Sequence, residues 1–192
     1  MKYFVSLFIF ILISIVLMSE NASADSKKRN ISPTLALKNY RELFGALQTA
    51  TRVDPSVSEI ANYYTQVMAQ LPRSGTLVEF NSQSLIASVG LSSVFCKRLI
   101  YQDSSLNVPK SGLNKGIDFM KPVSQVTDTK ITDLVKNYSN AFLQRDATAS
   151  EQTTLVDLFK SQGSSDATPN GTKKAVLAVC TSIASSFEFL SN

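Results

Sequence analysis

The two cysteines are the residues of this sequence with the most chemistry open to them. Cys96 lies in the segment SSVFCKRLI and Cys180 lies in LAVCTSIAS, and the chain holds no other cysteine. Each lies in an apolar run with small neighbours. Such a pair has three roles open to it: a disulfide bond, the ligation of a bound group, or two free thiols that pack as small apolar side chains.

The spacing of the apolar residues places both cysteines on buried helix faces. On each of two predicted helices, the cysteine belongs to a set of residues three and four positions apart, which is the repeat of a single helix face. The sets are Ile86, Val89, Ser93, Cys96 and Ile100 on one helix, and Val176, Cys180, Ile183, Phe187 and Leu190 on the other.

A disulfide between these helices is geometrically reasonable. Facing Cα atoms of packed helices approach to about 4–5 Å, and disulfides need Cα separations of about 4.4–6.8 Å. In an exported protein, an even cysteine count indicates pairing. We therefore predict a structural Cys96–Cys180 disulfide, with two free buried thiols as the alternative. Small residues should permit the approach: Gly90, Ser92 and Ser93 on one helix, and Ala178, Thr181 and Ala184 on the other.

Most other chemistry lacks the residues that it needs. The chain has no histidine, which removes the usual general base and the commonest metal ligand. Phosphate-binding glycine motifs and the Ser-x-x-Lys arrangement are also absent. A pair of carboxylates remains an enzymatic option, but no spacing brings two together. We therefore expect no enzyme, no cofactor and no metal site. The carboxylates considered are Glu42, Glu59, Glu79, Asp128, Asp133, Glu151, Asp157 and Glu188.

The N-terminus has the layout of a secretory signal peptide. Lys2 precedes an apolar stretch from Tyr3 to Met18, and Ala22-Ser23-Ala24 forms a small-x-small cleavage site. We predict a cleaved signal over residues 1–24 and a mature chain over 25–192. The basic cluster at 27–29 favours the alternative, a retained anchor in the opposite orientation.

The mature chain reads as a single all-α domain of five to six helices. Ser32-Pro33 and Asp54-Pro55 resemble helix starts, and Thr148 with Glu151 forms a capping box. No stretch shows the sustained alternation of a β-strand. The predicted helices cover about 32–49, 54–71, 82–101, 131–144, 148–161 and 173–190, and the segment 103–130 is predicted to be a long loop.

The long loop is the predicted partner-binding segment. It combines three lysines with three apolar residues, which suits contact with a partner or an acidic surface. The alternative, which we favour for the apolar residues, is that they pack beneath the domain's own helices. Gly112 to Gly116 superficially suggests a phosphate loop, but a flexible surface turn fits better because a strand is missing before it. The candidate binding residues are Lys110, Lys115, Ile117, Phe119, Met120 and Lys121.

Two stretches carry a family resemblance. VDPSVSEIANYYTQVMAQLPRSGTLVEFNSQSLIASVGLSSVFCKRLI resembles a helical module of uncharacterised exported bacterial proteins, in which a helix ending in Leu-Pro is followed by Phe and then by a helix ending in Cys and Leu. RDATASEQTTLVDLF and AVLAVCTSIASSFEFL are similar to C-terminal helices of the same proteins, with a late Cys before a Ser-x-x-Phe-Leu end. The resemblance implies an envelope or surface role and transfers no catalytic residue.

These observations favour a non-enzymatic interaction or structural component of a bacterial envelope or surface assembly. We expect a periplasmic or cell-surface location and a protein partner in the envelope. The net charge of +4 is scattered, so nucleic acid is not an expected partner, and membrane contact is limited to the signal peptide or the periphery. The alternatives are a small ligand- or polysaccharide-binding helical module and, third, a hydrolase that uses a carboxylate pair.

Overall fold

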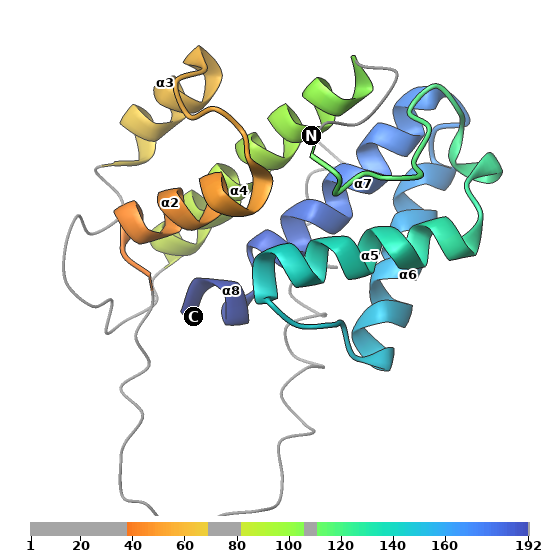
Figure 1. Cartoon of the computed structure of the whole chain (residues 1–192). Coiled ribbons are helices and arrows are strands. Elements are labelled where there is room, and N and C mark those ends of the chain that lie inside the picture. The colour runs from red at the N-terminus through yellow and green to blue at the C-terminus, as the bar shows by residue number, and fades with distance from the viewer. Residues whose placement is uncertain (1–37, 69–81, 106–110, 192) are drawn as a thin grey trace, which may run out of the picture. The chain divides into compact units, whose positions relative to one another are not determined.

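The computed structural model describes residues 38–68, 82–105 and 111–191 (Figure 1). All of these residues fall in one structural unit. The predicted signal peptide, its cleavage site and Lys110 lie outside the described residues. Within the described ranges every regular element is a helix, which confirms the all-α prediction.

Seven α-helices and one short 3-10 helix make up the described part of the chain. Their labels follow Figure 1, in which the numbering begins at α2. The helices are α2 (Tyr40–Thr51), α3 (Ser58–Val67), α4 (Ser82–Ser104), the 3-10 helix η1 (Val123–Gln125), α5 (Asp128–Leu143), α6 (Ala149–Ser164), α7 (Pro169–Ala184) and α8 (Phe187–Ser191).

The first two described helices begin later than the sequence predicted. At α2, the Asn39 side chain accepts hydrogen bonds from the backbone of Arg41 and Glu42, and the Asn39 amide donates to Glu42 Oε2 at 2.8 Å. This reciprocal cap starts a helix at Tyr40, so a single helix over 32–49 is wrong. At α3, the Asp54 carboxylate accepts from the backbone of Ser56 and stabilises a turn, and the helix starts only at Ser58.

The C-terminal helix of the prediction is two helices. Thr168 caps α7, with Pro169 at its first position, and the chain leaves the helical path at Ser185 before α8 begins. The predicted helix over 173–190 is therefore wrong at both ends. The interruption changes the phase of the repeat, so Phe187 is 50% exposed, whereas the sequence placed it on the buried face. Phe189 is buried in its place.

Helices α4 and α7 form the centre of the packing. Helix α4 contacts α2, α3 and α7, and α7 contacts α4, α5, α6 and α8. Because α4 has neighbours on more than one side, its buried surface is a broad face and not a single line of residues. Ile86, predicted to be buried, is 54% exposed, while Ala87, Leu91 and Phe95 are buried.

Helix α4 is long and apolar enough to cross a membrane by length and composition, the single such helix in the described ranges. Half of its most apolar window is buried inside the fold. Core helices pass the same test, so its contacts with three other helices are sufficient to explain its composition.

Candidate functional site

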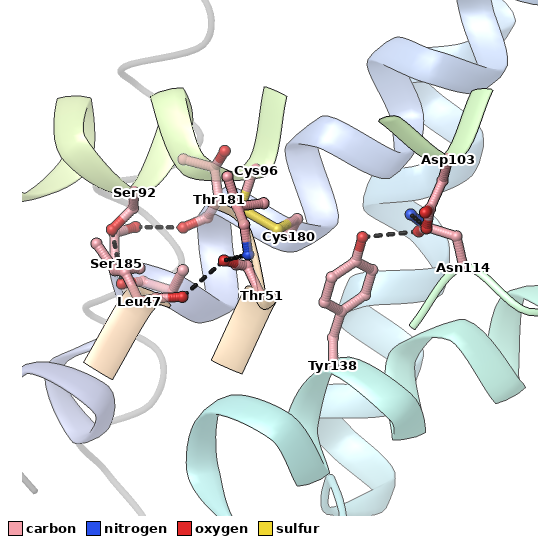
Figure 2. Close-up of a disulfide and its surroundings, with 12 residues drawn as sticks. Leu47, Thr51, Ser92, Cys96, Asp103, Asn114, Tyr138, Cys180, Thr181 and Ser185 are labelled. Atoms are coloured by element: carbon pink, nitrogen blue, oxygen red, sulfur yellow. Dashed lines mark hydrogen bonds between the residues drawn. A yellow bond between two sulfur atoms is a disulfide. The ribbon is translucent and has the colours of Figure 1, made fainter. Parts of the chain in front are cut away.

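The predicted disulfide joins the two central helices. Cys96 of α4 and Cys180 of α7 form a bond with a Cα–Cα distance of 5.9 Å, which lies in the ordinary range (Figure 2). Both cysteines are 0% exposed. The prediction is confirmed, and the alternative of two free thiols is wrong.

Small residues allow the close approach, though not all of those that the sequence suggested. Ser92, four residues before Cys96, donates a hydrogen bond to the Ala184 carbonyl oxygen at 2.8 Å across the α4–α7 interface. Gly90 instead faces α3, because a Cβ built there would lie 1.6 Å from the Tyr63 hydroxyl oxygen. Gly90 therefore permits α3, and not α7, to approach α4.

A buried polar cluster lies at the C-terminal end of α4 (Figure 2). Asp103 Oδ2 accepts hydrogen bonds from Ser111 Oγ at 2.6 Å and from Asn114 Nδ2 at 2.9 Å. The Tyr138 hydroxyl of α5 donates to Asn114 Oδ1 at 2.7 Å. We call these four residues the Asp103 network. Asp103, Asn114 and Tyr138 are each at most 1% exposed, so the network is part of the core.

The electrostatics of the Asp103 network favour a structural role. Burial raises the pKa of Tyr138, and the nearby Asp103 carboxylate raises it further, so the hydroxyl stays protonated and remains a donor. Ser111 Oγ also accepts from the Leu113 amide at 3.1 Å, an arrangement typical of a turn cap. The network therefore fixes the turn after α4 against α4 and α5.

A polar cleft of about 340 Å³ lies beside this network, between the ends of α2 and α4. Arg52 forms one wall, and its left-handed backbone (φ 55°) ends α2. Ligand sites of this size are lined mostly by apolar residues, whereas every residue that lines this cleft carries a polar side chain. The lining residues are Thr51, Arg52, Asp54, Gln102, Asp103, Ser105 and Ser111.

The predicted partner-binding residues separate into core and surface. Ile117 and Phe119 are buried at 5% and 4% exposure, as the alternative interpretation required. Met120 is 74% exposed, and Lys115 and Lys121 are exposed beside it in the sequence. The structure therefore leaves three of the described candidates available to a partner.

The long loop is shorter and better anchored than predicted. Helix α4 extends to Ser104 and α5 begins at Asp128, so both ends of the predicted 103–130 loop are helical. Two glycines with positive φ, 73° at Gly112 and 88° at Gly116, flank a turn whose central Asn114 is fully buried. The predicted surface turn is therefore present, with Gly112, Lys115 and Gly116 exposed, and the buried Asn114 attaches it to the core.

Hydrogen bonds from two helices hold the same segment at two further positions. The Thr172 hydroxyl of α7 donates to the Lys121 carbonyl oxygen at 2.6 Å. The Asn137 side chain of α5 donates to the Leu113 carbonyl oxygen at 3.3 Å. Met120 thus protrudes from a turn that is held at its base by two helices.

Two carboxylates do meet in the structure, but an arginine lies between them. Arg145 Nη1 and Nη2 donate to both Glu151 oxygens at 2.8 Å. Its Nε and Nη2 donate to Glu188 at 2.7 and 2.5 Å. We call these three residues the Arg145 triad; it joins the start of α6 to α8.

The triad holds the Glu151 carboxylate in the ionised form. The Arg145 hydrogen bond lowers the pKa of Glu151 to about 2, with a further contribution from the Thr148 cap. The two glutamates in turn raise the pKa of Arg145. A general acid needs a pKa near the working pH, so Glu151 does not suit the role of general acid in glycoside hydrolysis.

Helix α8 is also bound to the start of the described chain. The Lys38 amide donates to the Leu190 carbonyl oxygen at 2.7 Å, and its Nζ donates to the Phe189 carbonyl oxygen. Lys38 Nζ lies 4.8 Å from the centre of the Phe189 ring, and burial lowers the pKa of this lysine. The Phe189 ring packs edge to face on Phe142.

Among the described residues, no group of three or more His, Cys, Asp or Glu side chains is placed to hold a metal ion. No family model, curated protein or solved structure matches the chain. The resemblance to exported helical proteins therefore stays a prediction.

The sequence analysis did not identify the residues that form the long-range hydrogen bonds and ion pairs. Asp103 was placed at the start of a loop, and Tyr138 was given no role. Glu188 was treated as isolated. The stretch RDATASEQTTLVDLF contains both Arg145 and Glu151. That arginine, next to a capping box, was the one local signal of an ion pair.

Proposed function

We propose that this protein is a non-enzymatic, exported helical domain that serves as an interaction or structural component of a bacterial envelope or surface assembly. The observation that carries the proposal is the buried Cys96–Cys180 disulfide at the α4–α7 interface. Structural disulfides form and persist in oxidising compartments and are rare in the cytosol. The disulfide thus supports export, in agreement with the predicted signal peptide over residues 1–24.

The hydrogen-bonded polar groups of the Asp103 network and the Arg145 triad support an interaction role over catalysis. Asp103 is bound by Ser111 and Asn114, and Glu151 is bound by Arg145. Groups held in this way stabilise helices and turns. A reactive group would instead need an approach for substrate and a matched pKa.

The turn that carries Met120 is the surface we propose for the protein partner. Met120 is 74% exposed, and Lys115 and Lys121 lie on the same short segment. Because the turn is anchored on α5 and α7, it presents these side chains without a large ordering cost on binding. An apolar anchor beside lysines fits an envelope protein with an acidic rim around an apolar pocket.

The test is a crosslinked pull-down of the tagged full chain from the native envelope fraction, read by mass spectrometry. We expect a stoichiometric protein partner that survives stringent washing. The variant Met120→Ser with Lys121→Glu should lose it. Ile86→Ser, which removes another exposed apolar residue far along the sequence, is the matched control and should retain it. Recovery of the protein alone, or equal recovery with both variants, contradicts the proposal.

The polar cleft favours a second candidate function, the binding of a small polar ligand. Arg52, Asp54 and Gln102 offer charged and amide groups at its surface. A thermal-shift screen of monosaccharides and amino acids tests this candidate. A stabilising ligand whose effect disappears in Arg52→Ala would support it, and a flat screen would leave the interaction role as the better account.

A further inference from the structure

The disulfide is closed off from any external thiol. Both half-cystines are 0% exposed; Cys96 lies in the interior of α4, and Cys180 lies near the C-terminal end of α7. Residues Leu47 and Thr51 of α2, also at most 1% exposed, are among the side chains around the bond (Figure 2). The bond is therefore enclosed by three helices.

Thiol–disulfide exchange needs direct access to sulfur. A thiolate attacks one sulfur of a disulfide through a mixed-disulfide intermediate, so the rate depends on the exposure of both partners. When α7 is packed on α4, neither an oxidant nor a reductant reaches Cys96 or Cys180. The Ser92 to Ala184 hydrogen bond, together with the buried Val176 and Ile183 of α7, holds that interface closed.

The position of Cys180 adds an ordering requirement. The two cysteines are 84 residues apart, and α5 and α6 lie between them in the chain. Helix α4 precedes α7 in the chain by two helices. The pairing therefore requires α7 to be present, and it has free access to an oxidant only while α7 is not packed against α4.

We infer that the substrate of oxidation is an open folding intermediate of this chain, in which α7 is not yet packed on α4, and that the reaction partner is a disulfide oxidant. One cysteine thiolate attacks the oxidant's disulfide, forms a mixed disulfide and expels one oxidant thiolate. The second cysteine thiolate then attacks the chain's sulfur in that bond and expels the other oxidant sulfur. The chain loses two protons and two electrons, and both sulfurs of the oxidant leave as thiols.

Packing also limits the oxidation of the reduced chain. If α7 packs on α4 before oxidation, two thiols are enclosed and each must wait for the interface to open. Oxidation and packing therefore compete, and the order of the two events decides how fast the native disulfide forms. This competition depends on the burial of the sulfurs and is independent of the proposed envelope partner.

An order-of-addition experiment on the purified full chain tests the inference. The chain is denatured, reduced and then refolded, and oxidised glutathione is added either at the start of refolding or after refolding is complete. Alkylation and intact-mass measurement follow the free thiols. We expect disulfide formation to be at least about tenfold slower in the second case, because exchange then requires opening of the packed interface. Equal rates in both cases, with a reduced chain shown by circular dichroism to be folded, overturn the inference.

Reduction of the native protein is the second measurement, and it covers a reduced chain that does not fold. Dithiothreitol should reduce the native disulfide at least about 100-fold more slowly than it does in denaturant, since native-state openings of core helices are rare. Ser92→Ala, which removes one bond across the interface, should accelerate native reduction, while Thr65→Ala on the exposed face of α3 should not. Reduction at the same rate in native buffer and in denaturant overturns the inference.

Discussion

The Asp103 network is open to a direct energetic test through Tyr138. The Tyr138 hydroxyl donates to Asn114 Oδ1 at 2.7 Å, and both residues are 0% exposed. Tyr138→Phe removes the hydroxyl donor and keeps the ring. The buried Asn114 Oδ1 then loses this hydrogen bond. Such an unpaired buried acceptor costs about 1–3 kcal/mol, so we expect a loss of about 2 kcal/mol in the free energy of unfolding.

A double-mutant cycle separates the contact from general damage to the core. Asn114→Ala removes the acceptor for Tyr138 and the donor to Asp103, so it should cost about 2–3 kcal/mol by itself. In the Asn114→Ala background, Tyr138→Phe should reduce the free energy of unfolding by about 1 kcal/mol less than it does in the wild type, because the hydrogen-bond partner of Tyr138 is already absent. Tyr101→Phe, at a side chain that is 62% exposed, is the matched control and should stay within about 0.5 kcal/mol of the wild type.

The assay is urea denaturation at pH 7, followed by far-ultraviolet circular dichroism with linear extrapolation. The same series at higher pH gives an independent readout. The pKa of Tyr138 is raised above its usual value of 10, so the protonated hydroxyl stabilises the fold fully below pH 10 and less as the pH rises above it. The difference in the free energy of unfolding between the wild type and Tyr138→Phe should therefore become smaller at alkaline pH.

Two results would refute this reasoning. Additive effects of the two substitutions within about 0.3 kcal/mol would mean that Tyr138 and Asn114 do not interact. A Tyr138→Phe variant as stable as the Tyr101→Phe control would mean that the hydroxyl finds no partner in the core.

Three further predictions concern the disulfide, the Arg145 triad and a glycine contact. Replacing both half-cystines by alanine should cost about 4.6 kcal/mol, the chain-entropy value for the 84-residue separation, measured by urea denaturation. Arg145→Gln should cost about 1 kcal/mol at pH 7, a value reduced by solvent screening. Because the pKa of Glu151 falls from 4.5 to about 2, the wild type should also lose stability as the pH falls through that window, and the variant should lose less. Gly171→Ala should cost about 3 kcal/mol, since its Cβ would lie 2.0 Å from the Asp166 carbonyl oxygen, whereas Gly45→Ala, with nothing within 4 Å, should gain about 0.5–1 kcal/mol.

Each of these predictions has a contrary outcome. A disulfide-free variant within about 1.5 kcal/mol of the wild type would mean that the unfolded chain is not restrained by the bond as the entropy model requires. Parallel acid-denaturation profiles of wild type and Arg145→Gln would exclude the triad as the source of the acid sensitivity. Equal stabilities of the two glycine variants would mean that the α6–α7 connection adjusts to a methyl group at no cost.

Local signals predicted much of the helical framework, because capping and periodicity act within a few residues. The Thr148 and Glu151 capping box was read from the sequence, and the structure has both of its hydrogen bonds. Helix starts were less predictable where several candidate caps lie close together. Asn39 prevails over the upstream Ser32-Pro33 as the cap of α2 because it has a glutamate three positions later, which completes the reciprocal pair.

Long-range contacts account for what the sequence did not reveal. Asp103 and Tyr138 are far apart in the chain, and only the packing of α4 near α5 brings both to Asn114. Arg145 and Glu188 meet for the same reason, since α8 turns back after Ser185. No local pattern encodes such pairs, because their hydrogen bonds form only when distant helices are packed.

The sequence by itself determined the fold class and the disulfide. Apolar repeats of three and four residues imply helices, and two cysteines on such faces, behind a predicted signal peptide, imply a bond between them. The tertiary structure decided which residues are available at the surface. It placed Ile117 and Phe119 in the core and left Met120 exposed, because burial depends on where the turn meets α5 and α7 and not on hydrophobicity alone.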